Sequence, residues 1–386
     1  MLLFVMFGCG CDEPVEPART FDRPRLVRED PTDAPLDGLS AEQLERFERG
    51  DALFRTPYRA VQGLGPLYIE RSCTSCHEHD ARGPGLVRRI VPAPGLALPF
   101  GDVVRPRLAA GARTPLLAPQ GSAESIRLPP AVFARGLLEA IDDAWILAQE
   151  LAQATTPGPP DGRAARLSEE PETPTSVLHP PPRLGRLGHK ARRATLEAFV
   201  ADALHGDMGL TSPARPEEPP NPDGLTDDAR PGIDVSAQTV ALLVDYVRLL
   251  QPPSRRTHDR RGERLFEQVG CADCHVPRAR TRTDHPVAAL RGVEVALYTD
   301  LLLHDMGEGL ADGITENAAG PRHWRTAPLV GIRHLRGLLH DGRAATVWDA
   351  IDAHDSPGSE ASASVARFRA LDRADAEVLV AFVEAL

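Results

Sequence analysis

The sequence has few aromatic side chains, few cysteines and no long hydrophobic run beyond its first residues. Aromatic residues make up 5% of the 386 residues, whereas proline contributes 37. We therefore expect a core built mainly from Leu, Val and Ala, with long irregular loops around it. Six cysteines are too few to staple a chain of this length, which excludes a disulfide scaffold. No later stretch approaches the ~18 consecutive apolar residues of a membrane span.

Negative charge exceeds positive charge. The chain has 44 Lys and Arg against 55 Asp and Glu, a net charge of -11, which argues against a nucleic-acid partner because phosphate binding needs clustered basic residues. The sequence has no P-loop, dinucleotide fingerprint or Ser-His-Asp pattern, so kinase, nicotinamide-enzyme and hydrolase functions have no support. The length predicts about two domains.

Four of the six cysteines stand in two copies of one motif, Cys73-Thr74-Ser75-Cys76-His77 and Cys271-Ala272-Asp273-Cys274-His275. C-x-x-C-H is the attachment signature of c-type haem, in which two thiols bond to the haem vinyl groups and the histidine binds the iron. A zinc site from two C-x-x-C pairs, or a thioredoxin-like redox pair, would not explain the histidine after each second cysteine. The sequence therefore predicts two covalently bound c-type haems, with His77 and His275 as proximal iron ligands.

The N-terminus predicts export. Residues 1–11 contain a short apolar run that ends at Gly8-Cys9, which resembles a bacterial lipoprotein leader with Cys9 as the lipidated residue. A signal peptide that is simply cleaved remains the alternative. Residues 12–38 are rich in Pro and charge, and predict a flexible tether. Because haem is attached to such motifs after export, we expect the protein in the periplasm or at the outer surface, held to a bacterial membrane only by lipid.

The remaining sequence predicts a mainly α fold with two cytochrome c-like helical domains, 39–251 and 256–386. Each half has an opening helix before its motif and a closing helix at its end: helices start at Ser40, where Gln43 completes a capping box, and at Arg261, and the closing helices cover 235–250 and 372–386. Pro252-Pro253-Ser254-Arg255 separates the halves. The first domain carries a long Pro-rich loop insertion, about 83–186, with one helix-like stretch at 131–152. Since such loops are usually functional, we expect it to cover the first haem or the cleft between domains.

Two methionines remain for the sixth position of the irons. Met208 and Met306 each lie in an Asp-Met-Gly sequence, one per half. Met306 follows His275 by 31 residues, whereas Met208 follows His77 by 131, so Met306 is the more accessible ligand within one compact domain. A methionine is often only a gap-filler, and His304 and His323 are the alternative ligands.

Several longer segments resemble the di-haem oxidoreductase family, whose members are described as peroxidases. The resemblance runs from about Leu39 to the C-terminus, and its segments are 63–67, 136–141, 298–307, 324–329 and 340–343. The stretch from Trp324 to Gly342 is similar, more distantly, to bacterial di-haem cytochrome c peroxidases. The resemblance implies two cytochrome c domains, with one haem storing an electron and the other reacting. One departure is His189, which stands where the family usually has a tryptophan.

Further site candidates follow from residue chemistry. Arg325 and Arg343 suit haem propionates, because a guanidinium pairs with a carboxylate through two hydrogen bonds. Glu139 is a candidate acid or base for peroxide chemistry, with a helix-surface carboxylate as the alternative. Trp324 is a candidate electron carrier, with a packed interface side chain as the alternative. His340 resembles a turn residue of a haem pocket.

Two functions remain open. As an enzyme, the protein would reduce hydrogen peroxide or oxidise a substrate at one haem, exchanging electrons through the other. As a non-enzymatic carrier, it would have two six-coordinate irons and pass single electrons. In either case we expect a small periplasmic cytochrome as electron donor or acceptor, and the enzyme also needs a small-molecule oxidant. The family resemblance and the long insertion favour the oxidoreductase.

Overall fold

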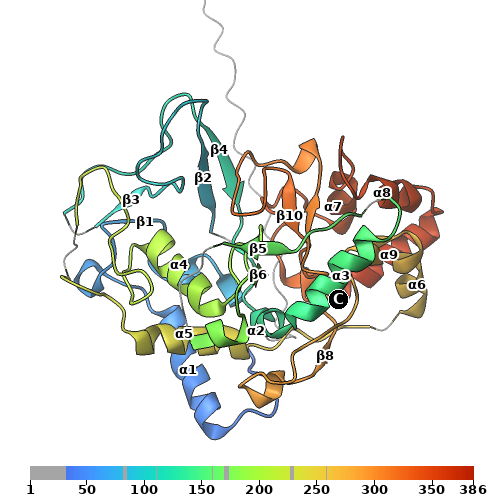
Figure 1. The fold of residues 1–386 in the computed structure, drawn as a ribbon, viewed down its shortest axis with the longest axis horizontal. Coiled ribbons are helices and arrows are strands. Elements are labelled where there is room, and N and C mark those ends of the chain that lie inside the picture. Colours follow the sequence, from blue (N-terminus) through green and yellow to red (C-terminus); the bar gives the residue numbers. More distant parts are fainter. Residues whose placement is uncertain are drawn as a thin grey trace, which may run out of the picture.

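The computed structural model describes residues 32–80, 85–109, 111–158, 160–168, 174–226, 230–257 and 259–386 (Figure 1). The predicted leader, the lipidation candidate Cys9 and most of the tether lie outside these residues. Within the described ranges, no helix combines the length and the apolar character that crossing a membrane requires.

The described part of the chain is mainly helical, with short strands between the helices. The α-helices are α1 (Ala41–Arg55), α2 (Arg135–Ala140), α3 (Asp143–Ala154), α4 (Leu196–Met208), α5 (Ala237–Leu249), α6 (Arg260–Gln268), α7 (Val347–Ala353), α8 (Ser362–Arg369) and α9 (Arg373–Glu384). The strands are β1 (Leu67–Tyr68), β2 (Val87–Val91), β3 (Arg107–Leu108), β4 (Ala123–Arg127), β5 (Ala165–Leu167), β6 (Arg183–Gly185), β7 (Ala279–Arg280), β8 (Glu294–Val295), β9 (Leu303–Asp305) and β10 (His323–Arg325). They form antiparallel two-stranded pairs, β1–β3, β2–β4, β5–β6, β7–β8 and β9–β10.

The predicted opening and closing helices are confirmed. Helix α1 begins after Ser40, whose hydroxyl accepts the Gln43 N–H while the Gln43 side chain accepts the Ser40 N–H. Helices α5, α6 and α9 match the other predicted segments within about two residues. The single helix predicted over 131–152 is wrong, because Ile141 is extended and the Asp142 carboxylate caps a new helix by accepting the Ala144 N–H.

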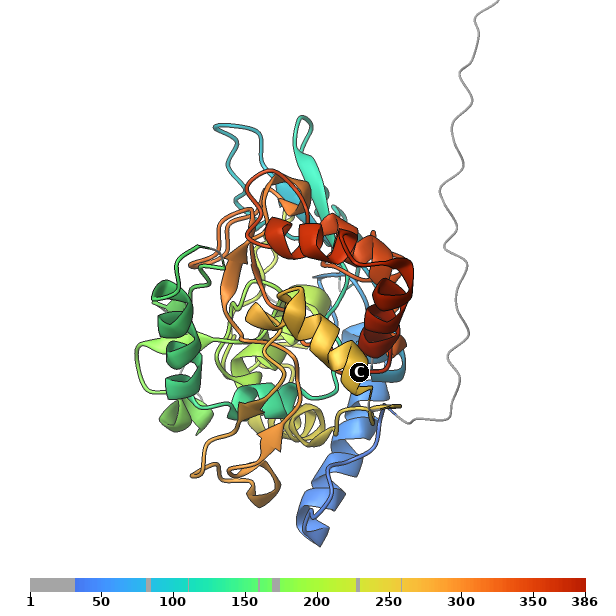
Figure 2. The same cartoon turned by 90° about the vertical axis from the view of Figure 1, so that its right-hand side faces the viewer.

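Each half of the chain contains a close helix crossing at a glycine. In the first half, a Cβ at Gly50 of α1 would lie 2.2 Å from the Leu242 carbonyl oxygen of α5. In the second half, a Cβ at Gly262 of α6 would lie 2.4 Å from the Phe382 Cβ of α9. Figure 2 shows α6 and α9 crossing in this way. The opening and closing helices of each half therefore pack at distances that only glycine permits.

A hairpin is also repeated in the two halves. Leu187 pairs with Arg193, and Leu338 pairs with Ala344, through N–H···O bonds of 3.0 and 2.8 Å. The two hairpins share the sequence Leu-x-His-x-x-Arg-x-Ala-Thr, at 187–195 and 338–346. Both have left-handed residues at their second and fifth positions, and both end in a threonine that caps the next helix, α4 or α7. The repeat supplies an alignment of the two halves.

The hydrophobic core has three main clusters. One joins α1, α4 and α5, and another joins α6, α7, α8 and α9. The third combines residues of the 131–184 segment, such as Leu138 and Ile141, with second-half residues such as Leu297 and Leu302. In Figure 1, α2 and α3 accordingly lie between the two halves, whereas β2 and β4 project away from the body. The insertion thus contributes core packing as well as loops.

Candidate functional site

The two C-x-x-C-H motifs have the same local conformation. Each begins with one turn of 3-10 helix, Cys73–Ser75 or Cys271–Asp273. In each, the histidine N–H donates to the carbonyl of the first cysteine at an N···O distance of 2.9 Å. One short turn therefore keeps both thiols and the imidazole together, as attachment of one haem requires.

The motifs line separate pockets. The motif at 73–77 lines a cavity of about 100 Å³, the first pocket, and the motif at 271–275 lines a cavity of about 230 Å³, the second pocket. The four cysteines therefore cannot share one zinc ion. Burial, above all, raises the pKa of Cys76 and Cys271 to about 12, so both side chains are neutral thiols at pH 7 when no group is attached.

His275 is prepared to bind a metal through one nitrogen. Its Nδ1–H donates to the Tyr298 carbonyl oxygen at 3.0 Å, which leaves Nε2 for a ligand. Burial, followed by the neighbouring His354, lowers the pKa of His275 to about 4, so the ring is neutral at pH 7. Two adjacent thiols and a neutral imidazole, whose Nδ1 is held by a carbonyl and whose Nε2 can bind iron, form a donor set that fits a c-type haem.

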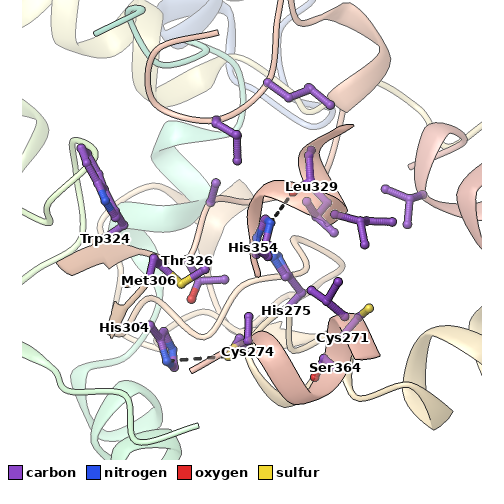
Figure 3. A pocket seen from close by; sticks show the side chains of 18 of the residues that line it. Cys271, Cys274, His275, His304, Met306, Trp324, Thr326, Leu329, His354 and Ser364 are labelled. Atoms are coloured by element: carbon purple, nitrogen blue, oxygen red, sulfur yellow. Dashed lines mark hydrogen bonds between the residues drawn. The ribbon is translucent and has the colours of Figure 1, made fainter. Parts of the chain in front are cut away.

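Met306 lies in the second pocket, directly after β9. Figure 3 shows Met306, His304, Trp324 and Thr326 on one side of the pocket and His275 on another. The Met306 N–H donates to the Arg322 carbonyl at 3.0 Å, which fixes the backbone of the Asp-Met-Gly sequence beside β10. The structure therefore brings this predicted ligand to the same cavity as the motif at 271–275.

His304 lines the second pocket, but both of its nitrogens are engaged. Nε2 bonds the Asp300 carboxylate at 2.8 Å and Nδ1 bonds the Glu360 carboxylate at 2.7 Å. Burial opposes a charge on the ring, but Cys274 and Asp300 raise the pKa of His304 well above its usual value. A histidine that donates from both nitrogens has no lone pair for iron, so the geometry does not favour His304 as the alternative ligand.

His354 is a pocket residue that the sequence analysis missed. It follows α7 and lines the second pocket. Its Nδ1–H donates to the Ala350 carbonyl at 2.6 Å, and desolvation lowers its pKa, so Nε2 is an unprotonated nitrogen. His354 is thus a second neutral histidine in the same cavity as His275.

The hairpin repeat shows how His354 could have been found. Counting from the capping threonines, four positions of α4 that line the first pocket match four positions after Thr346 that line the second: Leu196 with Val347, Phe199 with Ala350, Val200 with Ile351, and Ala203 with His354. The shared Leu-x-His-x-x-Arg-x-Ala-Thr sequence is visible without a structure. The two pocket walls therefore share one backbone arrangement, and at the last of the four positions one has alanine where the other has histidine.

The first pocket contains the other predicted methionine. Met208 is buried at the C-terminal end of α4 and lines this pocket together with Asp207 and Phe54. The Phe54 and His77 rings lie 6.2 Å apart. Burial raises the pKa of Asp207 to about 6, which makes it a pocket carboxyl that sequence reasoning did not single out.

The structure does not bring Glu139 to either pocket. Its side chain is fully buried against Arg248 of α5, with Oε2···Nε at 2.7 Å, and Oε1 accepts the Leu196 N–H at 2.8 Å. Glu139 therefore joins α2, α5 and the start of α4. The expected acid or base and the expected surface carboxylate are both replaced by a buried ion pair.

Two more predicted residues lie outside the pocket walls. Arg343 is half exposed and bonds the Asp341 carboxylate at 2.6 Å and the Gly309 carbonyl at 2.7 Å. The Arg163 Nη2–H donates to His323 Nε2 at 2.6 Å, so the lone pair of that ring nitrogen is already engaged. Neither side chain lines a pocket, because each is bonded to neighbouring groups outside it.

The first hairpin lies between the pockets. Gly188 lines the first pocket and the next residue, His189, lines the second. Arg325, predicted for a propionate, lines the second pocket and donates from Nε to the Gly188 carbonyl at 3.0 Å, while its N–H donates to the His189 carbonyl at 2.9 Å. Arg325 therefore connects β10 to the segment that separates the two cavities.

Comparisons with known proteins give one family and two similar structures. Residues 120–386 match the family described as "Di-haem oxidoreductase, putative peroxidase". No curated protein matches the chain significantly. Hydrazine synthase of Kuenenia stuttgartiensis, solved under 20 bar xenon, is similar at 15% identity and a TM-score of 0.37, over 94% of this chain and 100% of that one. A MauG-like protein associated with microbial copper homeostasis is similar at 18% identity and a TM-score of 0.42, over 96% of this chain and 95% of that one.

The family match covers well over half of the sequence. It includes the second C-x-x-C-H motif and every residue that lines the second pocket. The chain belongs to the di-haem oxidoreductase family.

Proposed function

We propose that the protein is a periplasm-facing di-haem c-type oxidoreductase with peroxidase-like activity. The observation that carries the proposal is that each of two pockets receives one complete C-x-x-C-H turn. Cys73 and Cys76 would hold one haem with His77 as ligand, and the equivalent residues at 271–275 would hold the other. The helix crossings at Gly50 and Gly262 support two cytochrome c-like domains around these groups.

The protein's own side chains would hold the haem and orient its ligands, while a bound haem supplies the one-electron and peroxide chemistry. The Tyr298 carbonyl fixes the His275 ring, and Arg325 fixes the segment between the pockets. Apolar side chains of α4 and α7 line the two cavities and would shield a bound haem from water.

The two sites differ in the side chains that could bind the sixth coordination position of a haem iron. The second pocket offers Met306 and His354, whereas the first offers Met208 and has Ala203 at the position that matches His354. A closed site suits electron storage and an open site admits a substrate. We infer that the second site stores the electron, and that the first reacts with hydrogen peroxide or another small substrate when Met208 does not bind.

Ligand assignments can be tested by spectroscopy of single variants. If Met306 binds, Met306→Ala removes the far-red charge-transfer band of a Met-ligated ferric haem; if His354 binds, His354→Ala changes the low-spin spectrum and Met306→Ala does not. Met208→Ala should open only the first site and leave peroxide turnover intact or raised. Loss of turnover in Met208→Ala, with unchanged turnover and spectra in both second-pocket variants, contradicts this division of roles.

Covalent attachment has a direct test. The mature protein should keep two haems through acid-acetone extraction, and the double variant Cys73→Ala with Cys76→Ala should keep one. The variant Cys271→Ala with Cys274→Ala is the matched control and should keep the other. Protein that contains zinc and no covalent haem would end the proposal.

Location and partners are part of the proposal. Cys9 after an apolar run supports a lipid anchor on a bacterial membrane, and covalent haem supports an exported protein that exchanges electrons with a small periplasmic cytochrome. With a haem-maturation system present, wild-type protein should partition with membranes and Cys9→Ala should not. Soluble wild-type protein beginning after Cys11 would indicate a cleaved signal instead.

A non-enzymatic electron carrier is the second candidate, and one observation favours it. Met208 is buried in the first pocket and supplies that cavity with a thioether. In a carrier, both irons would be six-coordinate in the oxidised and the half-reduced protein. Half-reduced protein that neither binds nor consumes peroxide would favour the carrier over the oxidoreductase.

A further inference from the structure

Trp324 has an unusual position for a residue that lines a redox pocket. It is the middle residue of β10, and its side chain is buried at 8% exposure. The indole Nε1–H donates to the Leu310 carbonyl at 2.9 Å. One face of the indole stacks on His340, with ring centroids 4.0 Å apart and planes 14° from parallel.

A buried ammonium group covers the indole as well. Lys190 Nζ lies 4.2 Å from the Trp324 ring centroid, and the Lys190 side chain is fully buried. It is held there by the Asp312 carboxylate at 3.1 Å and the Gly320 carbonyl at 2.8 Å. These bonds fix the charge over the ring.

The other basic groups near the indole are farther away or uncharged. The Arg127 guanidinium lies 5.4 Å from the ring centroid and is paired with Asp312 and Glu316. Burial, more than any other cause, lowers the pKa of His340 to about 4, so the stacked imidazole is neutral at pH 7. The Lys190 ammonium is therefore the closer of the two cations that lie over the indole.

We propose, resting on the function proposed above, that Lys190 is a positioning residue that keeps Trp324 reduced while the second pocket handles oxidising equivalents. Loss of one electron would put positive charge into a ring 4.2 Å from a desolvated ammonium. The attraction between cation and neutral ring would become repulsion between like charges. Trp324 is then a packed, protected wall of the pocket and not an electron carrier between the haems.

The oxidation can be driven without any peroxide turnover. Hexachloroiridate(IV) is an outer-sphere oxidant that takes one electron per ion. Two ions and one water convert an indole to its hydroxylated product, with two Ir(III) ions and two protons released. The haem-loaded, full-length protein is treated, and peptide mass spectrometry measures oxidation at Trp324 against Trp145 and Trp348, the other two tryptophans of the chain.

Lys190→Met should raise the oxidation of Trp324, relative to Trp145 and Trp348, by roughly tenfold, the size expected for loss of a desolvated cation–π contact. Lys190→Arg keeps the charge and should restore the wild-type ratio. Arg192→Met is the matched control, because Arg192 in the same hairpin lies 5.3 Å from a different ring, that of Phe199. An unchanged Trp324 ratio in Lys190→Met, or an equal rise in Arg192→Met, would overturn the proposal.

A pH series tests the charge in the unaltered protein. Burial lowers the pKa of Lys190 to about 8; Asp312 and Glu316 oppose this shift, and Arg127 adds to it. Three further groups surround the ammonium: His323, the neutral His340, and Arg89, whose own partner is Glu316. The Trp324 ratio should therefore rise between pH 7 and about pH 9.5 in wild type and stay flat in Lys190→Arg, whose guanidinium remains charged. A flat wild-type profile would contradict the assignment. Because the oxidant is added, neither outcome depends on peroxidase activity.

Discussion

At the scale of single residues, the buried pair of Glu139 and Arg248 is an interaction that the sequence did not reveal. Burial acts to raise the pKa of Glu139, but Arg248 and the Leu196 N–H hold it below its usual value. Arg248 also bonds Glu197 at 2.9 Å. The carboxylate therefore stays charged at the junction of α2, α4 and α5.

Glu139→Gln should destabilise the protein strongly, because it leaves part of a buried guanidinium charge without its partner. We expect a loss of about 3 kcal/mol in the free energy of unfolding, measured by urea titration. Glu150→Gln, which breaks the exposed pair with Arg166, is the control and should cost at most ~1 kcal/mol. Equal effects in the two variants would show that burial does not set the strength of the Glu139 pair.

The Glu316 carboxylate predicts how stability depends on acid. Although burial acts in the opposite direction, Arg127 and then Arg89 lower the pKa of Glu316 to about 2, from 4.5 in a free side chain. A lowered folded-state pKa contributes stability that is complete above the unfolded value and is lost as the pH falls through the folded value. The free-energy difference between wild type and Glu316→Gln should thus be constant from pH 7 to about 5 and shrink towards pH 2. A difference that stays constant down to pH 2 would contradict this.

Residue chemistry explains which site residues could be predicted from the sequence. The two cysteines and the histidine of each C-x-x-C-H motif are neighbours in sequence, so one short turn brings them together and the sequence alone predicts the group. Met208 and Met306 could be predicted as candidates because methionine is scarce in this sequence, and both side chains do line a pocket. The Lys190–Trp324 contact depends on which hairpins and strands meet across the molecule, and local sequence carries no record of that. His354, in contrast, could have been found by aligning the two copies of the hairpin sequence.

At the scale of elements, the repeated hairpins each deliver a threonine cap to a pocket wall. The Thr195 hydroxyl accepts the Ala198 N–H of α4, and the Thr346 hydroxyl accepts the Asp349 N–H of α7. Helices α4 and α7 were not among the predicted helices, whereas the start of α1 was predictable from the capping box of Ser40 and Gln43. The division of 131–152 into α2 and α3 was not, because the apolar pattern continues through Ile141 while Asp142 starts a new cap.

Thr195→Ala and Thr346→Ala should each cost about 1 kcal/mol, the usual loss for an N-cap hydroxyl. Because the caps belong to different pocket walls, the local effects should separate. Hydrogen–deuterium exchange should accelerate in the first turn of α4 only for Thr195→Ala, and in the first turn of α7 only for Thr346→Ala. Acceleration of both helices by either variant would mean that the two walls open together.

At the scale of the whole molecule, the two halves hold each other in place. The Leu128 N–H donates to the His340 carbonyl at 2.8 Å, and the Arg325 N–H donates to the His189 carbonyl at 2.9 Å, so each half binds the hairpin of the other. The cluster that contains Leu138 also draws residues from both halves. The Pro252-Pro253 linker marks a boundary in sequence, whereas the packing joins the halves across it.

Cutting the linker should therefore leave the molecule assembled. A protease site inserted after Arg256 in the full chain would separate the halves covalently, and we expect both fragments to co-elute in gel filtration with both haems, because the shared core stays buried. Leu138, which is 0% exposed in that core, is the residue to weaken: Leu138→Ala should cost about 3 kcal/mol, which lowers the affinity of the cut halves by more than ~100-fold. Cut Leu138→Ala protein should then separate at micromolar concentration while cut wild type does not. If cut wild type already separates, the halves are independent domains that only touch, and the 131–184 segment folds with the first half alone.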